Sequence, residues 1–213
     1  MGYNTGRERA EALASRLPGT GHFSMFLSAT DSGAIRTAAN EIERRFERVD
    51  VLVNSAGTTR AVPHGDLEAM DDETFDRILI TSVRGPFAVI RAFLPLLRRS
   101  GDAVVVNMSS FAALRGQGSS VPYAASKAAV DTMGESLARA LAPTIRVVGI
   151  VPAGVDTDFI PGRTQEGFLR DIAQSPLKTI CQPDEVAMAV LAAVTHLRLT
   201  TGSTILVDGG SHL

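Results

Sequence analysis

The chain has 213 residues, 45% of them hydrophobic, which is enough to bury one sizeable core in a single domain over residues 1–213. Its 21 Lys and Arg residues nearly balance 23 Asp and Glu residues. The net charge of −2 gives no excess of positive charge for binding nucleic acid or an anionic membrane. Cys181 is the single cysteine, so an intrachain disulfide is excluded. The sequence has no cluster of metal ligands, no signal peptide and no apolar run of ~18 residues. We therefore expect a cytoplasmic protein with no metal and no membrane span.

Apolar runs that suit short strands alternate along the chain with longer amphipathic segments. In chain order, helices are predicted at 7–17, 32–46, 71–99, 121–141 and 184–196, and strands at 23–27, 49–53, 103–107, 145–151 and 204–207. Strands that alternate with longer helices indicate βαβ units and a parallel sheet. The expected fold class is therefore α/β with a doubly wound, Rossmann-like sheet.

The segment 156–182 is a long connection rich in proline and glycine, with one helical turn predicted near 166–173. Long connections in compact domains are often lids over a functional site. The alternative is an ordinary surface loop.

Tyr123 and Lys127 form the most informative motif. At positions i and i+4 they share one face of the predicted helix 121–141. Free tyrosine has a pKa of about 10, too high for proton exchange near neutrality, and a neighbouring ammonium favours the phenolate. Ser110 ends the strand-like run before this helix, where its hydroxyl would hold a substrate oxygen. The alternative is a tyrosine and a surface lysine on an alanine-rich helix.

In this context the motif resembles the short-chain dehydrogenase/reductase superfamily, in which the matching serine, tyrosine and lysine are the catalytic trio of NAD(P)-dependent oxidoreductases. The run that ends in Asn54-Ser-Ala56-Gly57 is similar to the family's Asn-Asn-Ala-Gly strand end. Pro152-Ala-Gly154-Val155, followed by Thr157, is similar to the Pro-Gly turn whose threonine meets the nicotinamide carboxamide. A last helix and Asp208-Gly-Gly complete a likeness along the whole chain.

The resemblance implies a role for each matched residue. Ser110 orients the substrate carbonyl, and Tyr123 protonates its oxygen in reduction and acts as the base in oxidation. Lys127 bonds the nicotinamide ribose and lowers the pKa of the phenol. Cofactor contacts fall on Asn54, Ala56, Gly57, Tyr123, Lys127, Pro152, Gly154, Val155 and Thr157. The substrate is a small alcohol or carbonyl compound.

Some positions depart from the family pattern. Ser82 stands where the fourth catalytic residue is normally Asn, Ser28 where an adenine-contacting Asp is usual, Ala153 where Gly is usual, and Val148 where Asn is common. These departures leave a rival open, a non-catalytic dehydrogenase-like protein that serves as a structural or regulatory partner.

Ser82 lies four residues before Pro86 on the long predicted helix. Pro86 supplies no N–H for the Ser82 carbonyl, so we expect a kink that frees this carbonyl. The family's Asn uses its own freed carbonyl to hold a water in the proton relay, and we hypothesise that the proline preserves this water. A kink that only accommodates packing is the alternative.

The opening Gly2-Tyr-Asn-Thr-Gly-Arg7 looks like the end of the family's second strand, with no acid before Glu8. An acidic residue there receives the ribose hydroxyls of NAD, whereas a 2′-phosphate needs polar and basic groups. NADP(H) is therefore favoured over NAD(H), with Arg7 as a cofactor-binding residue. The alternative is that Arg7 and Arg9 are exposed charges on the first helix.

The family commonly pairs the long helix and the tyrosine helix with their copies in a second subunit. This implies a homodimer or homotetramer. The small residues of helix 121–141 permit such packing, although they equally suit contact with the sheet.

The family's opening strand and glycine-rich Thr-Gly-x-x-x-Gly-x-Gly turn, whose helix holds the pyrophosphate, have no counterpart in this sequence. In the doubly wound order 3-2-1-4-5-6 their loss removes the middle of the sheet. We expect that the natural protein starts upstream, that the strand 23–27 is orphaned and that apolar edges beside 49–53 are exposed. The chain as it stands should bind dinucleotide poorly and be unstable, unless the sheet closes by a new pairing of the strands 23–27 and 49–53.

Overall fold

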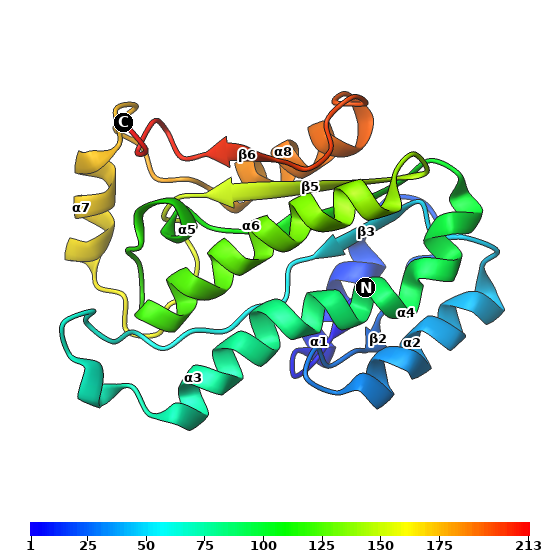
Figure 1. Cartoon of the computed structure of the whole chain (residues 1–213), viewed down its shortest axis with the longest axis horizontal. Helices are drawn as coiled ribbons and strands as arrows, with labels where there is room; N and C mark the ends of the chain where they lie inside the picture. The colour runs from blue at the N-terminus through cyan, green and yellow to red at the C-terminus, as the bar shows by residue number, and fades with distance from the viewer.

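The computed structural model describes residues 1–213 as an α/β fold (Figure 1). Its strands are β1 (Gly2–Tyr3), β2 (Met25–Phe26), β3 (Val51–Asn54), β4 (Ala103–Met108), β5 (Ile145–Pro152) and β6 (Ser203–Val207). Its helices are α1 (Arg7–Arg16), α2 (Ser32–Arg45), η1 (Leu67–Ala69), α3 (Asp72–Leu79), η2 (Ile80–Arg84), α4 (Gly85–Ser100), α5 (Ala112–Arg115), α6 (Val121–Leu141), α7 (Gln165–Gln174) and α8 (Pro183–Thr195). Every predicted helix and strand is present, within a few residues of its expected ends.

The main sheet has the strand order β3-β4-β5-β6, and all four strands run parallel. The valine-rich β4 is the most buried strand, because it has a strand on each side and helices on both faces. Its side chains alternate: Ala103 and Val105 belong to one hydrophobic cluster, and Val104 and Val106 belong to another. The prediction of a doubly wound parallel sheet is confirmed.

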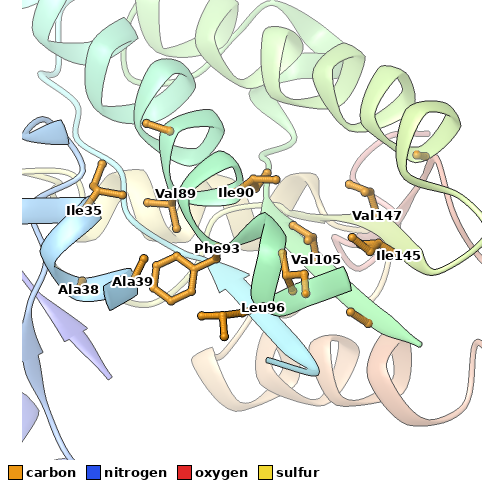
Figure 2. Packing of buried hydrophobic residues seen from close by; sticks show 14 residues of the cluster. Ile35, Ala38, Ala39, Val89, Ile90, Phe93, Leu96, Val105, Ile145 and Val147 are labelled. Carbon is orange, nitrogen blue, oxygen red and sulfur yellow. The ribbon is translucent and has the colours of Figure 1, made fainter. Parts of the chain in front are cut away.

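The two clusters form the core on either face of this sheet, with α6 in front of β5 and α8 behind it (Figure 1). In the larger cluster Phe93 of α4 points toward α2, beside Ala38 and Ala39, while the sheet supplies Val105 and Val147 (Figure 2). The smaller cluster joins α8 to the opposite face through Ala193, Val104, Val106, Val148 and Ile150. The core therefore fixes the strand ends, where the predicted site residues lie.

β1 and β2 form a separate two-stranded parallel sheet. The prediction that the strand 23–27 is orphaned is wrong in this respect, because Gly2 and Tyr3 pair with Met25 and Phe26. The predicted exposure of the β3 edge is confirmed, since Val51 and Val53 are 40% and 43% exposed. No strand pairing joins the two sheets, and packing of α2 on α4 holds the N-terminal unit to the rest.

α3, η2 and α4 form one continuous helical run, Asp72–Ser100. By length and composition alone this run is apolar enough to cross a membrane. The sequence predicts no membrane span, because it has no uninterrupted apolar run of ~18 residues. In the fold, its residues Val89, Ile90 and Phe93 are buried in the larger cluster. The run is thus the central core helix of the α/β fold.

The hydrogen bonding of this helix changes just before Pro86. Residues Ile80–Arg84 form a π-helical turn, in which the Gly85 N–H donates to the carbonyl oxygen of Ile80, five residues back. Pro86 has no N–H to offer the Ser82 carbonyl, and the wider turn accommodates this missing bond. The structure thus has a π-turn ahead of Pro86, and the kink that frees the Ser82 carbonyl stays a prediction.

Candidate active site

The predicted site residues gather where β3, β4 and β5 end, at one edge of the parallel sheet. Asn54 ends β3, and its Nδ2 donates to Oδ1 of Asn107 on β4 at 2.9 Å. The Nδ2 of Asn107 is buried without a partner. Pro152 ends β5, and Ser110 follows β4 by two residues. This bonded pair of asparagines therefore connects the ends of β3 and β4 at the site.

Tyr123 and Lys127 lie on the first two turns of α6, and both are buried, with 9% and 4% of their surface exposed. The Lys127 ammonium donates to the carbonyl oxygen of Met108 at 2.8 Å and lies 5.7 Å from the centroid of the Tyr123 ring. The spacing of four residues thus brings the two side chains together, as predicted. The lysine also connects α6 to the end of β4.

Ser110 lies beside the tyrosine. Its hydroxyl accepts from the N–H of Ala112 at 3.2 Å. Burial raises the pKa of Tyr123, and the nearby Ser110 hydroxyl partly opposes this. The expectation that Lys127 lowers the phenol pKa is not met, because burial dominates and the ammonium is directed at Met108. The neutral phenol is the favoured form, which suits a proton donor.

The connection between β5 and α8 reaches the site through Phe159, a residue that the sequence motifs did not indicate. Its ring centroid lies 5.8 Å from that of Tyr123. A Cβ placed on Gly57 would lie 3.7 Å from the Phe159 ring and 3.8 Å from the Lys127 ammonium nitrogen. Phe159 therefore occupies the space that Gly57 leaves open beside the tyrosine. An aromatic residue two positions after Thr157, inside a predicted lid, is the sequence signal that points to it.

The predicted turn residues Gly154, Val155 and Thr157 form the base of this connection. Arg163 donates to the carbonyl oxygen of Val155 at 2.8 Å and pairs with Asp171 of α7. A Cβ on Gly154 would lie 2.5 Å from the Arg163 and Asp171 side chains, so a side chain there would disturb the ion pair. This pair fastens α7 to the turn.

The other predicted residues differ in their surroundings. Ser82 is buried in η2, and its Oγ has no hydrogen-bond partner. Ala56 is exposed just beyond β3. Arg7 opens α1, and its exposed guanidinium pairs with Glu11 at 2.7 Å, which matches the surface alternative considered for it.

The nicotinamide end of the site fits the cofactor that the family resemblance implies. Ser82 Oγ, Ser120 Oγ and Asn107 Nδ2 are buried polar atoms without partners, as expected where a polar ligand or water completes the bonding. Asn54, Tyr123 and Lys127 would hold the cofactor there. For the pyrophosphate the chain offers no glycine-rich turn.

Comparison with known proteins assigns a family to this arrangement. The family described as enoyl-(acyl carrier protein) reductase matches residues 2–212. Among curated proteins, the chain is 38% identical over 211 residues to the granaticin polyketide synthase putative ketoacyl reductase 2 of Streptomyces violaceoruber, covering 97% of this chain and 82% of that protein.

Solved structures give the same result. A putative short-chain dehydrogenase/reductase from Burkholderia xenovorans has a TM-score of 0.89 and 35% identity, covering 99% of this chain and 86% of that one. A short chain dehydrogenase from Burkholderia cenocepacia, solved in complex with NADP, has a TM-score of 0.88 and 28% identity, covering 100% of this chain and 86% of that one. The chain therefore belongs to the short-chain dehydrogenase/reductase superfamily and is an oxidoreductase, as its motifs predicted.

Proposed function

We propose that this chain is an NADP(H)-dependent oxidoreductase that reduces the ketone of a small molecule or oxidises the corresponding alcohol. The proposal depends on one observation, the convergence of Ser110, Tyr123 and Lys127 at a single sheet edge. Carbonyl reduction needs a group that binds the oxygen, a proton donor and positive charge near the developing anion. Ser110 would bind the oxygen, Tyr123 would donate the proton and Lys127 would supply the positive charge.

Each residue then has a definite task. The Ser110 hydroxyl holds the substrate carbonyl oxygen, and Tyr123 donates its phenolic proton to that oxygen. Lys127 would bond the cofactor ribose and, as a cation, stabilises the phenolate left on Tyr123. The nicotinamide, when bound, supplies hydride to the carbonyl carbon. Ser82, buried and without a partner, is the candidate for the water-linked relay that returns a proton to the tyrosine.

The choice of NADP(H) over NAD(H) depends on the end of β1, where no acidic side chain precedes Glu8. The Burkholderia cenocepacia relative solved with NADP supports it. Arg7 would meet the 2′-phosphate by exchanging its present partner, Glu11. A homodimer or homotetramer and a cytoplasmic location belong to the same proposal.

A 3-oxoacyl thioester is the first substrate class to test, because the Streptomyces violaceoruber relative is named as a putative ketoacyl reductase. At cofactor concentrations high enough to offset the poor dinucleotide binding expected without the glycine-rich turn, we expect the full chain to consume NADPH with acetoacetyl-CoA, with a higher kcat/KM than it shows with NADH. Absorbance of the reduced nicotinamide measures both rates. Higher kcat/KM with NADH would overturn the cofactor choice alone.

The rival function, a non-catalytic partner protein, is favoured by one observation. Ser28, which replaces the usual adenine-contacting Asp, is buried, and its hydroxyl bonds the Thr30 hydroxyl at 3.0 Å instead of facing a ligand. Fluorescence of NADPH and NADH on adding protein separates the two functions. No change with either cofactor at high protein concentration, together with no turnover, would favour the non-catalytic protein.

A further inference from the structure

The Lys127 side chain is almost fully buried, and burial disfavours the charged form of its ammonium. The ammonium donates within the chain to a neutral acceptor, the Met108 carbonyl oxygen. Burial lowers the pKa of Lys127 to about 8, and Asp131 opposes this lowering. Because the proposed function needs a cation beside Tyr123, a group that keeps the proton on the lysine would matter for the site.

Asp131 lies one helical turn beyond Lys127 on the same side of α6. Its Oδ1 is buried and has no hydrogen-bond partner, and a Cβ on Gly149 of β5 would lie 3.7 Å from this oxygen. The Ser109 hydroxyl is within reach of the Lys127 carbonyl oxygen, at 3.4 Å, and of the Asp131 carboxylate. A buried carboxylate oxygen without a partner is uncommon and requires an explanation.

We propose that Asp131 is a positioning residue of the active site, whose half-buried carboxylate keeps Lys127 charged from one helical turn away. The inference rests on the proposed function, in which Lys127 acts as a cation. Tyr123, Lys127 and Asp131 form a row at i, i+4 and i+8 along α6. The carboxylate acts through the poorly screened interior, since the ammonium bonds Met108 directly.

Few charged groups influence the protonation of Lys127 and Asp131. Burial raises the pKa of Asp131, Ser109 and Lys127 lower it, and Glu135 raises it. Glu135 is exposed, one turn further along the same helix. Ser109, just after β4, and Gly149 of β5 lie close to the carboxylate, and neither is ionisable. The other elements that contact α6 are α3, η2, α5, β5 and β6. Their charged residues are Asp72, Glu73, Asp76, Arg77, Arg84, Arg115 and Arg146, and none of them is a cause of the raised pKa of Asp131. Asp131 is therefore the one charge that opposes loss of the lysine proton.

The chain contains only two lysines, Lys127 and Lys178, which makes a direct titration feasible. Lysine labelled isotopically at Cε gives one NMR signal for each, and Lys178→Arg assigns them. The full chain is titrated as wild type, as Asp131→Asn and as Glu135→Gln. Asp131→Asn removes the charge with little change of shape. Glu135→Gln is the matched control, because it removes a charge one turn further from Lys127.

In the wild type we expect Lys127 to titrate at about pH 8. In Asp131→Asn the midpoint should fall by roughly half a pH unit or more, because loss of the opposite charge favours the neutral amine. The Lys127 midpoint in Glu135→Gln should stay unchanged. Asp131→Ser gives a second neutral variant with a smaller side chain and should lower the midpoint in the same way, so that the test survives if the asparagine variant fails to fold.

An unchanged Lys127 midpoint in a folded Asp131→Asn or Asp131→Ser protein overturns the role of Asp131 and leaves the proposed function standing. Failure of the wild type to bind or use NADPH, with the midpoint still shifted in the variants, overturns the proposed function and leaves the electrostatic role of Asp131 intact. The two failures are therefore distinguishable.

Discussion

Tyr123→Phe should lower turnover by a factor of about 10² or more while leaving cofactor affinity close to that of the wild type. The substitution keeps the ring, which packs with Ile78, Ala112 and Ala124 and against Phe159. It removes the phenolic oxygen, the group beside Ser110 that would donate the proton. Packing should survive, and the proton donor is lost. Steady-state rates with NADPH and acetoacetyl-CoA measure the first quantity, and NADPH fluorescence titration measures the second.

Tyr3→Phe is the matched control, because Tyr3 is the other tyrosine of the chain and lies on β1 against Phe26. Its turnover should equal that of the wild type. Retained turnover in Tyr123→Phe would remove Tyr123 as the acid/base. Loss of cofactor binding along with turnover would instead assign the tyrosine a role in shaping the cofactor site.

Phe93→Ala should lower the free energy of unfolding by about 3–5 kcal/mol, as expected for truncating a buried aromatic residue. Phe93 is 6% exposed and points from α4 toward Ala38 and Ala39 of α2 (Figure 2). This contact is important because no strand pairing joins β1 and β2 to the main sheet. The cavity should therefore loosen the N-terminal unit as well as the core. Chemical denaturation measures the loss.

Phe87→Ala provides the comparison on the same helix. Phe87 is 42% exposed, with the Arg91 guanidinium 5.7 Å from its ring centroid. Its truncation should cost no more than about 1 kcal/mol. Limited proteolysis adds a second readout, since Phe93→Ala should be cleaved sooner than Phe87→Ala in residues 1–46. Equal destabilisation by the two substitutions would contradict the packing of α2 on α4.

The order of helices and strands was predictable because long periodic segments and valine-rich runs carry a strong local signal. The helix Val121–Leu141 was predicted with the same ends that the structure gives. The four-residue α5 and the three-residue η1 carry no such signal, because neither spans the two turns over which a helical period can be recognised. Pro86 indicated an irregularity in the long helix, but the sequence pattern did not predict that it takes the form of a π-turn.

Ser110, Tyr123 and Lys127 were identifiable from spacing and strand context. The burial of Tyr123 and Lys127 was not predictable, because it depends on the segment 156–182 and on neighbouring strands. This burial reverses the expected direction of the Tyr123 pKa. Asp131 continues the same four-residue spacing, yet only packing shows that one of its carboxylate oxygens is buried. Phe159 follows Thr157 by two positions, but its contact with Tyr123 depends on how a distant segment folds back onto the site.

The most direct test of the central claim is the transfer of deuterium from NADPH, doubly deuterated at nicotinamide C4, to the carbonyl carbon of acetoacetyl-CoA. We predict that the wild type and Tyr3→Phe form an alcohol with one deuterium on the former carbonyl carbon, detected by mass spectrometry. Tyr123→Phe should form it slower by about 10² or more. An alcohol without deuterium, or no alcohol when NADPH is bound, would contradict hydride transfer at this site.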